Sequence, residues 1–159
     1  KGNDKVIIVL TDGANTYSAP NNDPADNKST YPAYGYTGQG HNGTGTTRLF
    51  MGTSSAIGRF NYSSSNYTSA LDEQMAKVCG NAKTSNVLVM TVSLDLSIGI
   101  SSENKAIEAL KKCASDSRFR KDPTDPSKPA KLYFNATGSN LAEKFKEVAD
   151  ELSNLRIVG

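Results

Sequence analysis

Residues 5–16 have the sequence KVIIVLTDGANT, in which residues 6–10 form an uninterrupted apolar run. The run is rich in β-branched residues and far too short for a membrane span, so it predicts a strand buried on both faces of a sheet. It ends at Thr11-Asp12-Gly13, which places a carboxylate at the carboxyl end of that strand. Because open α/β sheets bind their ligands at this end of the strands, Asp12 is the first candidate for a functional residue.

The length and charge of the chain limit its function. Its 159 residues suffice for a buried core, and we expect a single domain over residues 1–159. The net charge of +2 does not indicate a nucleic-acid partner. No apolar run approaches the roughly 20 residues of a transmembrane helix. Only four residues precede the first predicted strand, so we expect a fragment of a longer protein, with any export signal or membrane anchor upstream.

A long polar insertion, residues 14–65, follows this strand and is dense in Asn, Gly, Ser, Thr and Tyr. Connections of this length are uncommon inside compact domains and tend to be functional. Tyrosines among small polar residues, such as Tyr34 and Tyr36, suit adaptable protein contacts, and a surface insertion without a partner is an equal alternative. His41 has no second candidate ligand near it in the sequence, which favours a solvated loop residue.

Alternating helical and extended patterns account for the rest of the chain. Periodicity predicts helices from about residue 69, over residues 102–114 and over residues 139–155. Their apolar stripes are Leu71, Met75, Val78 and Ala82; Ala106, Ile107, Leu110 and Cys113; and Leu141, Phe145, Val148, Leu152 and Leu155. Residues 86–93 and 131–135 predict two further strands, and residues 116–131, with three prolines, predict a solvated loop. The order β-α-β-α-β-α predicts an α/β fold with a mostly parallel sheet and helices packed on it.

Two cysteines, Cys79 and Cys113, lie near the ends of the first two predicted helices. Right-handed crossovers place consecutive helices on the same face of a parallel sheet when its strands follow one another in one direction. The two helices would then run parallel and bring the cysteines to a similar height. From this pattern alone, a disulfide and two buried free thiols both remain open.

The segment VIIVLTDGANT resembles the LTDGxNT segment of von Willebrand factor A (vWA) domains. More specifically, the chain resembles the vWA-containing, TadG-like proteins of the tight-adherence (Flp) pilus assembly system. The features that carry this resemblance are Tyr34-Gly35-Tyr36, Leu71-Asp72 followed by Val78-Cys79, residues 110–115, residues 133–136 and the closing Leu155-Arg156. The resemblance spans nearly the whole chain apart from its loops. It implies a vWA-like, Rossmann-type fold, truncated to the carboxyl-terminal half of the domain.

The resemblance also bears on metal binding and on the cysteines. In the family a divalent cation is bound by an Asp-x-Ser-x-Ser motif, a Thr from a later loop and the Asp of Thr-Asp-Gly, which is Asp12 here. The first motif is absent from this chain, and Mg2+ requires near-octahedral oxygen ligands. We therefore expect no strongly bound cofactor in this chain, with Mg2+ or another divalent cation held only by an intact parent. The alternative is that the Asp12 carboxylate accepts backbone N–H bonds in a turn that Gly13 permits. The resemblance favours a Cys79–Cys113 disulfide and hence an oxidising compartment.

From this resemblance we expect a non-enzymatic, adhesion-type protein-binding module of a pilus-assembly protein in the bacterial cell envelope, periplasmic or on the cell surface. A membrane contact would come only from the missing upstream segment. The expected partner-binding surface is the carboxyl edge of the sheet, with Asp12, Tyr34, Tyr36 and Asp95. The truncation would expose residues 5–11 as an apolar edge strand. We expect a homodimer through this strand, the insertion, or the missing half of the domain to cover it.

Two alternatives to this function remain. A strand that ends in Asp-Gly also resembles phosphohydrolases of the haloacid-dehalogenase type, in which Asp12 would serve a Mg2+-dependent enzyme. Leu10 stands two residues before Asp12, however, so the paired carboxylates of those enzymes are absent. No nucleophile motif and no phosphate-binding glycine loop compensates for them. The other alternative is a structural remnant with no metal site.

Overall fold

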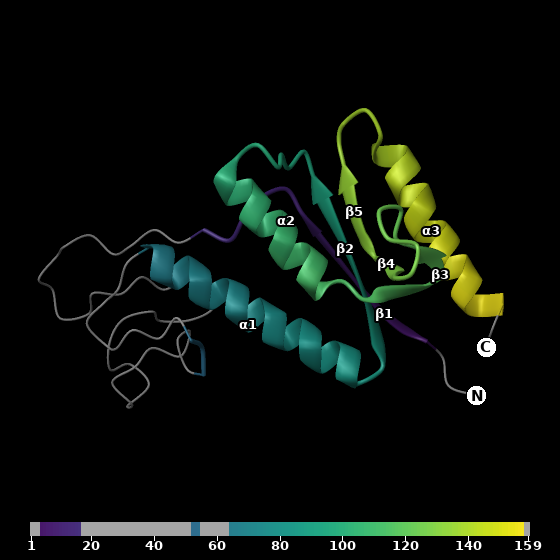
Figure 1. Ribbon diagram of the computed structural model, residues 1–159, viewed down its shortest axis with the longest axis horizontal. Helices are drawn as coiled ribbons and strands as arrows, with labels where there is room; N and C mark the ends of the chain where they lie inside the picture. Colours follow the sequence, from purple (N-terminus) through teal and green to yellow (C-terminus); the bar gives the residue numbers. More distant parts are fainter. Residues whose placement is uncertain (1–3, 17–51, 55–63, 158–159) are drawn as a thin grey trace, which may run out of the picture. The chain divides into compact units, whose positions relative to one another are not determined.

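The computed structural model describes residues 4–16, 52–54 and 64–157. In chain order its elements are β1 (Lys5–Thr11), α1 (Ser64–Thr84), β2 (Val87–Leu94), α2 (Ser101–Cys113), β3 (Asp116–Lys121), β4 (Pro129–Lys131), β5 (Tyr133–Ala136) and α3 (Leu141–Ile157). The chain divides into two compact units, Asn15–Met75 and a second unit that combines Lys1–Ala14 with Ala76–Gly159. We call the second one the sheet unit; all of the strands in the described residues lie in it (Figure 1). None of the described helices is long and apolar enough to cross a membrane.

The sheet unit is built on three parallel strands in the order β1-β2-β5. The central strand β2 is the most enclosed, and its Met90 and Val92 are almost fully buried. The register aligns Thr11 of β1 with Ser93 of β2, and Ser93 with Asn135 of β5, so the three strands end side by side. The predicted α/β fold with a parallel sheet is therefore confirmed.

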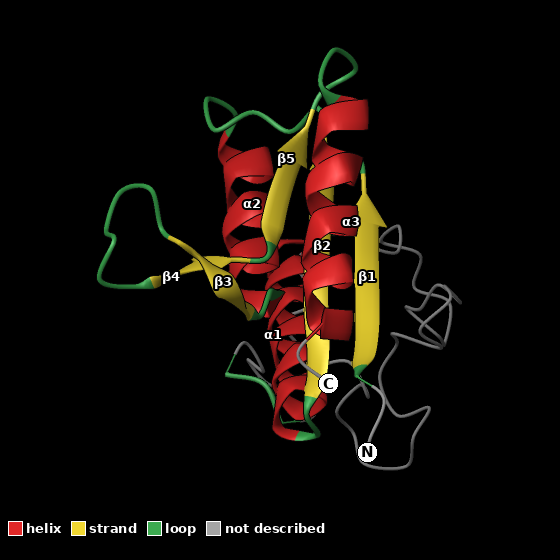
Figure 2. Ribbon diagram, turned by 90° about the vertical axis from the view of Figure 1, so that its right-hand side faces the viewer, coloured by secondary structure: helices red, strands yellow, loops and turns green. Residues whose placement is uncertain are grey.

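Helices cover the two faces of this sheet (Figure 2). On one face the Thr91 hydroxyl of β2 donates a hydrogen bond of 3.1 Å to the Leu110 carbonyl of α2. The other face is covered by α3 (Figure 2), whose Val148 belongs to the buried cluster of the sheet. The buried cluster on that face consists of Met90, Val92, Leu132, Phe134, Ala136 and Val148. Because side chains alternate along a strand, the even-numbered residues of β2 face α3 and the odd-numbered ones face α2.

A short antiparallel pair, β3 with β4, replaces the solvated loop predicted for residues 116–131. The sequence of β3, DSRFRK, has no apolar alternation to indicate a strand. Arg120 of β3 holds the strand in place. Its guanidinium stacks 4.9 Å from the centre of the Phe134 ring, and its Nε donates to Glu151 of α3. The Ser117 hydroxyl donates to the same carboxylate at 2.8 Å. These contacts fix the hairpin to α3, so the loop prediction is wrong for its strands.

The predicted stripe of the first helix is also wrong in part. α1 begins at Ser64, five residues before the predicted start. Val78, which the periodicity placed in the core, is 67% exposed, whereas its neighbour Cys79 is only 7% exposed. The buried side of this part of α1 is therefore turned by about one residue, about 100° around the helix axis, from the predicted one.

The burial predicted for β1 is wrong as well. Ile7 and Ile8 are each 46% exposed and Leu10 is 57% exposed. β1 is an edge strand of the described sheet, and no described strand pairs with its second edge. This agrees with the expectation that residues 5–11 form an exposed apolar edge. The strand has the composition of a buried one, but the described part of the chain covers only one of its edges.

Candidate functional site

Polar side chains line the carboxyl edge of the sheet, where Thr11, Ser93 and Asn135 lie on neighbouring strands. The buried Ser93 hydroxyl donates to Asn135 Oδ1 at 2.8 Å and accepts the Tyr133 hydroxyl at 2.8 Å. Burial raises the pKa of the Tyr133 phenol, an effect opposed by Ser93 and by the nearby Lys111. Tyr133 is therefore a neutral donor at physiological pH. Because all of its groups are satisfied internally, this buried network positions the strand ends and presents no free nucleophile.

The turn after β1 is closed by Thr11. Its hydroxyl donates to the Gly13 carbonyl at 3.0 Å and accepts the Gly13 N–H at 3.2 Å. The Asp12 side chain is exposed, and within the described residues its carboxylate forms no hydrogen bond or ion pair. Gly13 does not have a left-handed backbone, and a Cβ added there would meet nothing within 4 Å. The alternative role of Asp12 as an acceptor in a glycine-dependent turn is therefore wrong.

The described residues do not fit a Mg2+ centre. They contain no group of three or more His, Cys, Asp or Glu side chains able to hold a metal ion. Asp12 follows β1, and Asp95, in the loop after β2, already accepts the Gly138 N–H at 3.2 Å. A hard cation needs several convergent oxygen ligands. The expectation that this chain binds no divalent cation strongly stays a prediction.

The loop after β2, residues 95–100, is fixed at several points. Asp95 has a left-handed backbone with a φ of 54°, and its N–H donates to the Ala136 carbonyl at 2.7 Å. The Asn135 amide donates to the Leu96 carbonyl at 3.2 Å, and Leu96 itself is buried. Farther along, the Ser97 N–H donates to the carboxylate of Glu103 at 2.8 Å. The loop is therefore a rigid part of the sheet edge.

This loop presents two isoleucines to solvent. Ile98 is 76% exposed and Ile100 is 49% exposed. Exposed aliphatic side chains on a rigid backbone lose little conformational freedom when a partner covers them. The segment LDLSIGI, residues 94–100, carries an apolar residue at every second position. This alternation is the one sequence signal that singles out the loop. The structure then separates its residues, because Leu96 is buried whereas Ile98 and Ile100 are exposed.

Two of the four residues predicted for the partner-binding surface lie at this edge. Asp12 follows β1 and Asp95 follows β2, the strand paired with β1 in parallel. Tyr34, Tyr36 and His41 lie outside the described residues.

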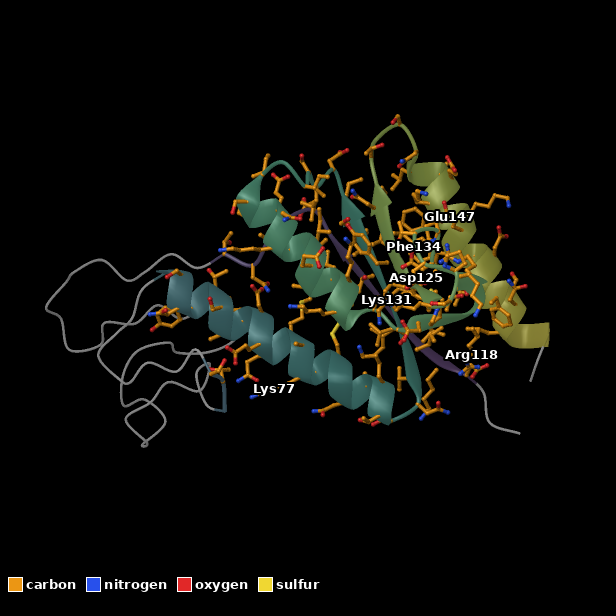
Figure 3. The ribbon with its side chains drawn as sticks, viewed as in Figure 1. Lys77, Arg118, Asp125, Lys131, Phe134 and Glu147 are labelled. Atoms are coloured by element: carbon orange, nitrogen blue, oxygen red, sulfur yellow. A yellow bond between two sulfur atoms is a disulfide. The ribbon has the colours of Figure 1, made fainter. Side chains whose placement is uncertain are left out.

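The predicted disulfide is confirmed. The sulfur atoms of Cys79 on α1 and Cys113 at the end of α2 are 2.00 Å apart, and both residues are buried. Near this bond, Lys83 Nζ donates to the Lys112 carbonyl at 2.9 Å. Figure 3 draws the disulfide as a yellow bond between the two helices. The bond and this hydrogen bond join the carboxyl-terminal part of α1 to α2.

Comparisons with protein-family models, with curated proteins and with solved structures find no match to this chain.

Proposed function

We propose that this chain is a non-enzymatic protein-binding module whose partner covers the carboxyl edge of the sheet. The observation that carries the proposal is the rigid loop after β2, which exposes Ile98 and Ile100 and also contains Asp95. Apolar side chains within a polar rim are the usual anatomy of a protein contact. The free carboxylate of Asp12 lies at the same edge and adds a charge for a basic partner group.

The more specific part of the proposal rests on the sequence resemblance to TadG-like proteins. On that basis the partner is a pilus or cell-envelope component, and the chain acts in the periplasm or at the cell surface. The disulfide supports this location, because such bonds persist in oxidising compartments. Tyr34 and Tyr36 belong to the same proposed surface.

Binding to purified pilus and envelope proteins encoded with this chain tests the proposal. Ile98→Asp should lower the affinity for the partner by about tenfold or more, because burying one isoleucine side chain contributes about 1.5–3 kcal/mol. The affinity is measured by biolayer interferometry. Phe119→Asp is the matched control, because it places the same charge on an exposed apolar site of β3 and should leave the affinity unchanged. Equal affinities for the wild-type chain and Ile98→Asp would contradict the proposed surface.

The proposed absence of catalysis has its own test. The Asp12 carboxylate has no second carboxylate two residues before it, where Leu10 stands. A screen of generic phosphate esters with Mg2+ should therefore show no turnover above the buffer blank. Turnover that disappears in Asp12→Asn would establish the hydrolase alternative instead.

A further inference from the structure

The carboxyl-terminal part of α1, residues 76–84, buries few of its side chains. Cys79 is the one buried residue among them, whereas Val78 is 67% exposed. A Cβ added at Gly80 would meet nothing within 4 Å, so the helix is loosely packed there as well. A glycine inside a helix also weakens the helix itself. Unlike α2, which buries a stripe of apolar side chains, this part of α1 is not held to the sheet unit by an apolar stripe.

Two contacts with α2 hold this part of the helix in the described structure. The first is the disulfide between Cys79 and the end of α2. The second is the exposed hydrogen bond that Lys83 Nζ donates to the Lys112 carbonyl at 2.9 Å. Burial, and then the charge of nearby Lys131, lower the pKa of Lys83, an effect that Asp116 opposes. Because its ammonium group is partly desolvated and lies near a like charge, the hydrogen bond is the weaker of the two contacts.

The buried cluster of the sheet unit contains no residue of α1. It consists of side chains from β2, β5 and α3 together with Leu132. On the opposite face of the sheet, α2 contacts β2 through the Leu110 carbonyl. Ile7 of β1 pairs in register with Val89 on that face, and Ile7 remains 46% exposed. The strands therefore have a core of their own, and it does not require the carboxyl-terminal part of α1.

The amino-terminal part of α1 contacts the insertion at two places. The Asn15 amide donates to Asp72 at 2.8 Å. The Ser54 N–H and hydroxyl both donate to the carboxylate of Glu73, each at 2.6 Å. Asp72 and Glu73 are consecutive residues of α1, so this one helix holds segments of the insertion that are far apart in the sequence.

We infer that the Cys79–Cys113 bond is a redox-sensitive tether for α1. The oxidised bond fixes residues 76–84 against α2, and its reduction releases them while the strands of the sheet stay paired. Because α1 is one continuous helix, its amino-terminal part and the insertion segments that it holds gain freedom at the same time. A loss of partner binding on reduction would rest on the proposed function, whereas the release of residues 76–84 does not.

The chemical step is thiol–disulfide exchange with a dithiol reductant. One thiolate of the reductant attacks a cysteine sulfur, which breaks the S–S bond of the chain and forms a mixed disulfide. The second thiolate of the reductant then displaces the cysteine, so the chain gains two electrons and two protons as two thiols and the reductant becomes a disulfide. Cys79 is the expected site of attack, because it is 7% exposed on the loosely packed helix whereas Cys113 is fully buried.

Amide hydrogen exchange of the oxidised chain and of the chain reduced with dithiothreitol tests this inference without any partner. Reduction should speed exchange within residues 76–84 by about tenfold or more, because the disulfide is the main restraint on local opening there. In the reduced chain, β2 should still exchange about a hundredfold or more slowly than these residues. Thiol titration of denatured samples establishes that the bond is fully reduced.

Lys83→Met is the matched control, because it removes the hydrogen bond to the Lys112 carbonyl and keeps the disulfide. In the oxidised chain it should speed exchange within residues 76–84 by less than about threefold. An effect as large as that of reduction would show that Lys83 is the tether and would overturn the inference.

Three results with the wild-type chain also overturn the inference. The first is equal exchange within residues 76–84 in the two redox states, and the second is an equal loss of protection in β2, which would mean that the whole unit unfolds. The third is a disulfide that dithiothreitol leaves intact in the folded chain. The binding of an envelope partner through Ile98 does not depend on any of these results.

Discussion

Asp95 combines a backbone requirement with a charge, and the two can be separated. Its φ of 54° is tolerated by Asp and Asn but is strained for a β-branched residue. Asp95→Val should therefore lower the free energy of unfolding by about 1–3 kcal/mol. Asp95→Asn keeps both the backbone preference and an acceptor for the Gly138 N–H, so its stability should stay within about 1 kcal/mol of wild type. Urea unfolding measures both values.

The same pair of variants distinguishes a structural from a binding role for Asp95. If its charge contributes to partner binding, Asp95→Asn should weaken binding while leaving stability nearly unchanged. If the residue only shapes the loop, Asp95→Asn should be neutral in both measurements. A stable Asp95→Val would show that the loop does not need the left-handed conformation.

Individual site residues could be predicted only where the sequence carried local chemistry. Asp12 and Asp95 each come within two residues of the end of a predicted strand, so their place at the sheet edge was predictable. The role of Thr11 could not be predicted. Either the Thr11 hydroxyl or the Asp12 carboxylate could accept the Gly13 N–H in this turn, and only the side-chain geometry shows that Thr11 does so. Ile98 was missed because an apolar residue in a loop is expected in the core, and only the fold shows that it is exposed.

At the scale of elements, the strength of the periodic pattern decided what could be predicted. The parallel strands and all three helices were predictable, since each has an apolar run or stripe of its own. The β3–β4 pair was not, because it is held by Arg120 and Ser117 against Glu151, contacts 31 and 34 residues apart in sequence. The apolar stripe predicted for α1 is wrong at Val78, because the neighbouring Cys79 occupies the buried position.

At the scale of the whole molecule, α1 begins in one compact unit and ends in the other. Cys79 lies three residues beyond Ala76, where the sheet unit resumes, so the disulfide joins the helix to α2 close to the point where it enters that unit. The bond and the Lys83–Lys112 contact join helices that the sequence keeps far apart. Stability of the sheet unit should therefore depend strongly on this bond.

Replacing both cysteines by alanine should lower the free energy of unfolding by about 3–4 kcal/mol, the chain-entropy value for a bond that closes a loop of this length. The sequence separation is 34 residues, so the unfolded chain gains considerable freedom when the bond is absent. Urea unfolding of the oxidised wild type and of the double variant measures the difference. Reduction of the wild type with dithiothreitol should produce a similar loss, whereas the double variant should not respond to the reductant. A wild type whose unfolding midpoint is unchanged by full reduction would show that packing between α1 and α2, and not the covalent bond, holds these helices together.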